Sequence, residues 1–330
     1  MGWRRQISAT TIGVGSALVL GLLAFFTPPA RAADKIATGA INSASPLGWP
    51  FYIGIAKGMF ASKGIDLDLV YTSSAPNLLQ QTAAGSLDLA MSTGLVDPIR
   101  AIVKGGPVSL ILVEVVAAPY ELLSHPEIRS LAQLKGKIIA VGGFNDITNI
   151  YLDRMLAPSG LKRGDFDMKF FGSTPARYAA LQAHAVDAAM LSQPANYYAA
   201  ASGYVSLGLV KDYAGDLPFS GSAVNTAWAK AHPDNVRAIV LTYVEAANWF
   251  QDRQNRDAAI KIMVDASQGK PDDVAKSYDF LQRGDYFERS GNISRTKIAR
   301  LVEAMHELGD IDDRPAPERL VLPGVTRLSD

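Results

Sequence analysis

The chain has no cysteine among its 330 residues. Disulfide frameworks, thiol nucleophiles and metal sites made of cysteine thiolates are therefore excluded. The absence also excludes the anchor of exported lipoproteins, because that lipid is attached to a cysteine at the cleavage site. We expect an unanchored protein that carries out no cysteine chemistry.

Charge and histidine patterns are also weak. Lysine plus arginine and aspartate plus glutamate both number 32, and the basic residues are scattered, so no nucleic-acid surface is indicated. The four histidines, His125, His184, His232 and His306, lack the spacing of metal ligands. Neither a G-x-S-x-G elbow nor a Walker A loop is present. We expect no metal, no cofactor and no catalytic centre, and hence a protein that is not an enzyme.

Residues 1–33 have the pattern of a signal peptide. Arg4 and Arg5 form a positive n-region, residues 12–26 form an uncharged apolar run, and residues 30–32 (Ala-Arg-Ala) form a small-x-small cleavage site. The run is too short for an ordinary spanning helix, and no later stretch is long and apolar enough to be one. The arginine pair is also compatible with a twin-arginine export signal, although an ordinary Sec signal fits better. We expect a periplasmic protein.

After the signal segment, short apolar runs alternate with helical patterns, and the sequence is helical from residue 233 onward. Strands are predicted at residues 35–41, 65–71, 87–91, 108–116, 137–141, 168–171 and 204–210. A Gly/Ser-rich segment, residues 220–228, is expected to cross between two parts of the molecule. The alternation predicts an α/β fold of parallel sheets covered by helices, in which ligands bind beyond the carboxyl ends of the strands.

One segment of the chain is echoed later without a gap. Residues 74–91 match residues 173–190, and both copies follow one predicted strand and run into another. Ser74 and Ser173 are predicted helix N-caps, each with a proline in the first helical turn. Because first-turn N–H groups point outward from a helix, each start is a ready anion site. Two such units predict two similar lobes that face one cleft.

Three carboxylates are candidates for a catalytic or ligand-binding role. Asp88 and Asp187 occupy matching places just before a strand, which makes a structural role more plausible than a catalytic pair. Glu114 lies within an apolar strand pattern. It either contacts a ligand from a buried position or caps the end of a strand at a hinge, and the sequence leaves both alternatives open.

Polar turns after the predicted strands supply the candidate ligand-binding residues. Small hydroxyls, backbone N–H groups and a few aromatics suit a small organic anion with an apolar or amine part. The candidates are Ser45, Trp49, Ser73, Ser74, Ser92, Thr93, Tyr120, Phe144, Asn145, Asp146 and Gln193. For the aromatic members core packing is the alternative, and it is strongest for Tyr120.

These candidates predict an orientation for the ligand. The anionic end is expected at Ser74, Thr93 and the backbone around Asn145, and the other end against Trp49 and Phe144. Trp49 stands between a glycine and a proline, a loop pattern in which a large exposed indole is not explained by packing. On this interpretation, replacing Trp49 with alanine weakens binding and leaves the stability of the protein nearly unchanged.

Several stretches resemble the aliphatic sulfonate, taurine and nitrate branch (NMT1/THI5-like) of ABC-transporter solute-binding proteins. The similar stretches are residues 50–70, which include a Lys-Gly-x-Phe turn, and residues 85–90, 134–137 and 186–189. The resemblance covers essentially the whole mature chain. It implies the type II periplasmic-binding-protein fold, with two lobes that are each a mostly parallel sheet flanked by helices. Lobe I would combine residues 34–120 with 224–330, lobe II would be residues 121–223, and two crossing segments would join them.

The resemblance also implies a function. The protein would be the periplasmic substrate-binding component of an ABC importer for a small anion such as a sulfonate, nitrate or an aromatic carboxylate. Its partners would be that solute and a membrane permease with its ATPase, and it would be a monomer. The alternative is an enzyme on the same fold that acts on a pyrimidine or another small heterocycle, as in thiamine-precursor synthesis. Those enzymes carry a cysteine-rich motif, which this chain lacks.

Overall fold

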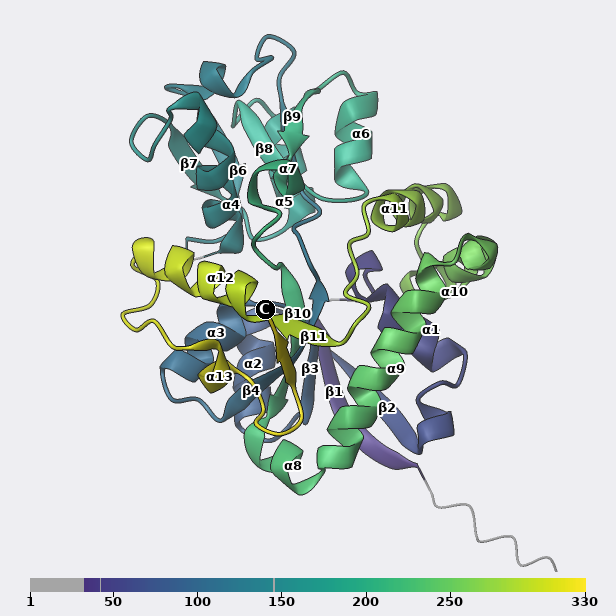
Figure 1. The fold of residues 1–330 in the computed structure, drawn as a ribbon. Helices are drawn as coiled ribbons and strands as arrows, with labels where there is room; N and C mark the ends of the chain where they lie inside the picture. Colours follow the sequence, from purple (N-terminus) through teal and green to yellow (C-terminus); the bar gives the residue numbers. More distant parts are fainter. Residues whose placement is uncertain (1–32, 42, 145) are drawn as a thin grey trace, which may run out of the picture. The chain divides into compact units, whose positions relative to one another are not determined.

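The computed structural model describes residues 33–41, 43–144 and 146–330 (Figure 1). The predicted signal segment up to residue 32 and the candidate Asn145 lie outside the described residues, so the structure leaves both predictions untested. Within the part of the chain that is described, no helix combines the length and apolarity needed to cross a bilayer.

Two five-stranded sheets organise residues 33–330 (Figure 1). The first has the order β2(Ile65–Thr72), β1(Asp34–Ile41), β3(Leu89–Gly94), β10(Ser220–Asn225), β4(Val108–Val115). The second has the order β7(Asp167–Phe170), β6(Ile138–Val141), β8(Ala188–Leu191), β5(Glu121–Ser124), β9(Val205–Leu209). In each sheet the first three strands are parallel and the fourth is antiparallel to both neighbours. The predicted mostly parallel α/β architecture is therefore confirmed.

Helices cover both sheets, and most begin where a strand has just ended. The α-helices that pack around the first sheet are α1(Trp49–Ala56), α2(Ala75–Ala83), α3(Val96–Val103), α8(Thr226–Ala231), α9(Pro233–Gln251), α10(Arg256–Ser267), α11(Pro271–Arg283), α12(Arg295–Glu307) and α13(Pro317–Leu320). Those of the second are α4(Ile147–Leu156), α5(Thr174–Gln182), α6(Ala195–Ala201) and α7(Val210–Ala214). Short 3-10 turns are η1(Pro46–Gly48), η2(Ala61–Lys63), η3(Leu131–Leu134), η4(Ala157–Ser159) and η5(Arg253–Asn255). A two-stranded parallel sheet pairs β11(Asn292–Ser294) with β12(Arg327–Ser329).

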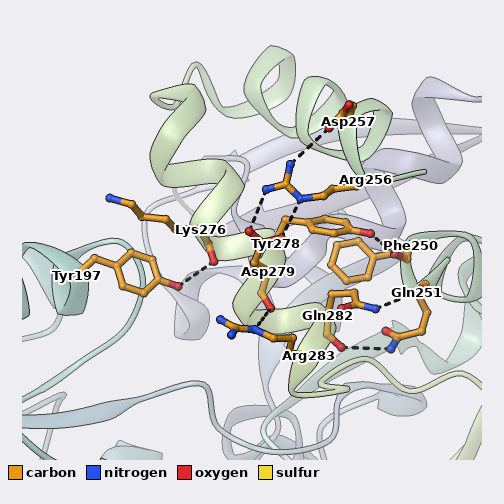
Figure 2. Close-up of polar contacts among 10 residues, drawn as sticks. All are labelled: Tyr197, Phe250, Gln251, Arg256, Asp257, Lys276, Tyr278, Asp279, Gln282 and Arg283. Atoms are coloured by element: carbon orange, nitrogen blue, oxygen red, sulfur yellow. Dashed lines mark hydrogen bonds and ion pairs between the residues drawn. The ribbon is translucent and has the colours of Figure 1, made fainter. Parts of the chain in front are cut away.

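The C-terminal helices are joined by polar contacts, shown in Figure 2. Arg256 of α10 forms an ion pair with Asp279 of α11 at 2.9 Å, and the Tyr278 hydroxyl donates to the Phe250 carbonyl at 2.8 Å. The Tyr197 hydroxyl of α6 donates to a carbonyl of α11 at 3.2 Å. Helices of the two sheets are thus in direct contact at this point.

The segment expected to cross between two parts of the molecule begins as a regular strand. Residues 220–225 form β10, an interior strand of the first sheet whose six residues are all buried. The strand is built from small residues because its neighbours are very close. A Cβ on Gly221 would come within 2.3 Å of the Leu112 carbonyl oxygen. Such a strand lacks the β-branched and aromatic side chains by which strands are recognised.

The structure confirms the two echoed units. The Ser74 and Ser173 hydroxyls each accept a bond from the backbone N–H three residues later, at 3.4 Å. The Asp88 carboxylate accepts from the Ala37 N–H at 2.9 Å, and the Asp187 carboxylate accepts from the Ile138 N–H at 2.8 Å. In both sheets the aspartate therefore ties the start of β3 or β8 to the neighbouring parallel strand, which is the structural role that the sequence favoured.

Asp88→Ala is expected to lower the free energy of unfolding by about 1–2 kcal/mol, because the Ala37 N–H loses a charged acceptor. Asp68→Ala is the matched control. The Asp68 side chain is 60% exposed in a 3.8 Å pair with Lys35, and we expect a change within about 0.5 kcal/mol. Urea unfolding followed by circular dichroism measures both. Equal effects of the two substitutions would contradict the structural role of Asp88.

Candidate functional site

A cavity of about 790 Å³ opens at the carboxyl ends of the parallel strands of both sheets. Its wall on the side of the first sheet includes Ser43, Ser45, Tyr52, Ser73, Ser74, Ser92, Asp97, Arg100 and Ser220. Its wall on the side of the second sheet includes Tyr120, Asp146, Ser173, Thr174, Ser192 and Gln193. The volume suits a small solute, and the lining is rich in hydroxyl groups.

Five helices of eight or more residues in the described part of the chain begin at this cavity. They are α1, α2, α3, α4 and α5, whose first residues or caps all line it. α3 has Asp97 in its first turn, and α4 is capped by Asp146. The first turns of α2 and α5 hold no acidic residue. Because first-turn N–H groups have no acceptor within their own helix, α2 and α5 present partial positive charge to the cavity.

The structure brings most of the predicted residues together. Seven of the eleven line the cavity: Ser45, Ser73, Ser74, Ser92, Tyr120, Asp146 and Gln193. They come from both sheets and meet at one cavity, although Ser92 lies within β3 rather than in a turn after it. Tyr120 lies edge-on to Phe219 at 5.6 Å and still reaches the cavity. Burial raises the pKa of the Tyr120 hydroxyl, and the nearby Arg177 opposes that rise.

Three predicted residues lie elsewhere, and the most instructive is Trp49. The predicted exposed loop indole is wrong: Trp49 is the first residue of α1, and its side chain is fully buried. The indole N–H donates to the Ala259 carbonyl at 2.9 Å, and the ring packs against Phe250 and Tyr278 at 5.3 and 5.7 Å. The indole is thus part of the core beneath α9, α10 and α11 and does not line the cavity.

Thr93 and Phe144 also depart from the predicted arrangement. Thr93 belongs to β3 rather than to a turn, is fully buried, and is not among the lining residues of the cavity. Phe144 is 77% exposed and lies edge-on to Phe170 at 5.7 Å. It lines a separate, smaller cavity with Asp146 and Arg163.

Glu114 lies behind the wall of the cavity and fixes the lining residue Ser92. Its fully buried carboxylate accepts from the Ser92 N–H at 2.9 Å and from the Ser92 and Ser222 hydroxyls at 2.5 Å. Burial raises the pKa of Glu114, and these three hydrogen bonds oppose the rise. Ser92 has a left-handed φ of 53°, a conformation that serine rarely adopts. The network therefore fixes the position of Ser92, and Glu114 supports the site rather than lining it.

The charged side chains that line the cavity do not fully neutralise one another. Arg100 forms ion pairs with Asp97 at 2.8 Å and with Asp310 at 2.7 Å. Burial raises the pKa of Asp97, and Arg100 opposes that rise. The Asp146 carboxylate accepts from the Thr148 N–H at 2.9 Å, as expected for a helix cap. The lining thus holds two carboxylates and one guanidinium, beside helix N-termini and hydroxyls.

The sequence interpretation missed part of the second wall. Ser173, Thr174 and Ser192 line the cavity, and Arg177 lies directly behind them. The repeat offered the signal, because Ser173 matches the candidate Ser74. Carrying the candidates of the first copy over to the second would have found Ser173 and Ser192, which match Ser74 and Thr93, but not Thr174, which matches Ala75.

The sequence profile of the NMT1-like family matches residues 35–264. No curated protein matches the chain in sequence. Among solved structures, the chain is similar to the periplasmic aliphatic sulphonate-binding protein SsuA of Escherichia coli. That structure has 18% identity and a TM-score of 0.73, and the match covers 91% of this chain and 95% of that one.

Two further structures are similar at lower TM-score. The periplasmic nitrate-binding protein NrtA of Synechocystis PCC 6803 has 16% identity and a TM-score of 0.62, with 74% of this chain and 70% of that one covered. The desulfurization enzyme DSZB has 15% identity and a TM-score of 0.62, with 87% and 97% covered. These similarities confirm the predicted periplasmic-binding-protein fold, and at such identity they show the fold alone.

Proposed function

Because the chain belongs to the NMT1-like family, we propose that it is the substrate-binding component of an ABC importer and that its solute is a small organic anion. The observation that carries the proposal is the cavity into which α2 and α5 both direct uncompensated N-termini. Such termini favour anions, and the surrounding hydroxyls supply hydrogen bonds. Sulfonates, nitrate and aromatic carboxylates are the solutes to be tested. The sulphonate-binding and nitrate-binding neighbours support this choice.

We further propose that the protein is exported and works in the periplasm as a monomer beside a permease and its ATPase. The signal-peptide pattern supports export. N-terminal sequencing of protein from the native host should find the chain starting at Ala33 or Asp34. Recovery of intact residues 1–30 in a membrane fraction would contradict the periplasmic location.

The binding role is tested with three anions, ethanesulfonate, nitrate and benzoate, and with the zwitterionic sulfonate taurine. At a concentration of about one hundred times its Kd, a ligand adds about 2.7 kcal/mol to the free energy of unfolding, so the melting temperature of a chain of this length should rise by about 4 °C. Differential scanning fluorimetry measures the rise, with tetramethylammonium chloride as a cationic control. If none of the four solutes raises the melting temperature, the proposed solute class is wrong.

The enzyme alternative has one observation in its favour, the similar fold of DSZB. Incubation separates the two roles, because a binding protein returns its ligand unchanged. Recovery of all added anion by nuclear magnetic resonance after prolonged incubation supports binding alone. Appearance of a product peak that depends on the protein would establish catalysis.

We propose that two lobes close around the ligand, with lobe I formed by residues 34–115 and 220–330 and lobe II by residues 121–214. The sequence boundary at residue 223 is moved because β10 is paired into the first sheet. The hinge would then lie in the two connections, residues 116–120 and 215–219. Small-angle scattering should show a smaller radius of gyration with saturating ligand. An unchanged profile, with binding established by calorimetry, would rule out large closure.

A further inference from the structure

A buried cation, Arg177, lies behind the wall of the cavity on the side of the second sheet. Arg177 of α5 is only 3% exposed. Its Nε donates to the Met190 carbonyl at 2.6 Å, and its Nη1 donates to the Phe171 carbonyl at 2.9 Å. Both acceptors are neutral, and within residues 33–41, 43–144 and 146–330 no carboxylate forms an ion pair with this guanidinium. A buried charge without a counter-charge is costly, so its retention calls for an explanation.

The repeat shows that the fold itself does not require this charge. In the ungapped match, Arg177 occupies the place of Leu78 in α2. Leu78 is fully buried in the core against the first sheet. The same turn of the same strand–helix–strand unit is thus satisfied by an apolar side chain in one copy. The arginine of the second copy therefore points to a role beyond packing.

Arg177 is connected to the cavity through two hydroxyls. Its Nη2 donates to Thr174 Oγ1 at 2.8 Å, and Thr174 Oγ1 lies 3.0 Å from Ser192 Oγ. Both hydroxyl side chains line the cavity. Because the Thr174 oxygen accepts from the guanidinium, its own proton is directed onward, and Ser192 can then donate into the cavity. The guanidinium carbon also lies 5.6 Å from the ring of Tyr120, a third lining residue.

We infer that Arg177 is the counter-charge for the anionic group of the ligand, which binds at the N-terminus of α5 against Thr174 and Ser192. This inference rests on the proposed function and adds an orientation, because it places the anion on the second wall rather than at Ser74 and α2. Arg177 is a positioning residue that acts through the two hydroxyls and through its field. An oxyanion with several acceptor oxygens, such as a sulfonate or a carboxylate, matches these donors.

Methionine and lysine at position 177 provide the test, because they have similar length and differ in charge. The probe is whichever of ethanesulfonate, taurine, nitrate and benzoate binds the wild-type protein most tightly, titrated by calorimetry. We expect Arg177→Met to weaken binding by about 30-fold or more, and Arg177→Lys by less than about 5-fold. Leu78→Met, at the equivalent place in α2, is the control and should change affinity by less than about 2-fold.

The melting temperatures of the ligand-free variants separate recognition from structure. Neither lysine nor methionine can reproduce the guanidinium's two bonds to both Met190 and Phe171. A structural role that depends on those bonds would therefore lower stability and affinity to a similar degree in the two variants. Equal loss of affinity in the lysine and methionine variants, or no loss in either, overturns the inference and leaves the proposed function standing. If the wild-type protein binds none of ethanesulfonate, taurine, nitrate and benzoate, the proposed function and this inference are overturned together.

Discussion

Replacing Trp49 with alanine is expected to lower the free energy of unfolding by about 3–5 kcal/mol. The indole is fully buried, packs against Phe250 and Tyr278, and donates to the Ala259 carbonyl. Alanine would leave a cavity among α1, α9, α10 and α11 and would remove the indole's hydrogen bond to the Ala259 carbonyl. The two aromatic neighbours are among the residues of Figure 2, where Tyr278 also donates to the Phe250 carbonyl.

Urea unfolding of Trp49→Ala, with Trp228→Ala as the control, measures this cost. Trp228 is half-buried and stacks on His232 at 5.4 Å, so its replacement should cost no more than about 1 kcal/mol. The exposed-indole interpretation makes the opposite prediction, with stability unchanged and affinity lost. A Trp49→Ala protein as stable as the wild type would therefore show that the indole does not pack in the core.

Gly221→Ala is expected to lower the free energy of unfolding by about 3 kcal/mol, which is at the upper end of the cost of adding one methyl group to a packed core. The new Cβ would lie 2.3 Å from the Leu112 carbonyl oxygen and 2.9 Å from a methyl group of Leu95. The first contact is with the backbone of β4, which cannot move without breaking the pairing of β10 with its neighbours. The strand must therefore shift, and the whole first sheet is weakened.

Gly94→Ala is the matched control for this substitution. Gly94 lies in β3 next to Ser220 of β10, and a Cβ there meets no atom within 4 Å. Its replacement should change stability by no more than about 0.5 kcal/mol. Thermal and urea unfolding of the pair give the comparison. If the two variants are equally stable, the close approach of β10 to β4 is not a property of the folded protein in solution.

The sequence predicted several strands well because each has a clear apolar pattern, continuous in β4 and alternating in β2. The predicted limits of β1, β2, β4 and β6 lie within one residue of the observed ones. β10 was missed because its close neighbours demand small residues, which look like a loop. β5 was missed because a four-residue strand gives too little pattern.

Only part of the candidate site was predicted from the sequence, because only part of it is formed by local sequence signals. Capping serines and prolines are local signals, so Ser45, Ser74 and their neighbours could be found from the sequence. The position of Trp49 depends on contacts about 200 residues away in the chain, with Ala259 at a separation of 210. No local pattern contains that information. Arg177 could have been found from the repeat, as the one charged residue in place of a buried leucine.

The position of β10 also orders events during synthesis and folding. β3 and β4 are not paired with each other, because β10 lies between them and arrives more than one hundred residues later in the chain. All five strands of the second sheet, in contrast, lie within the continuous stretch between residues 121 and 209. The first sheet therefore cannot be completed until the second sheet has been synthesised and the chain has returned to the first sheet as β10. Loop closure over such a separation is slow, and an incomplete first sheet exposes the facing edges of β3 and β4 until then.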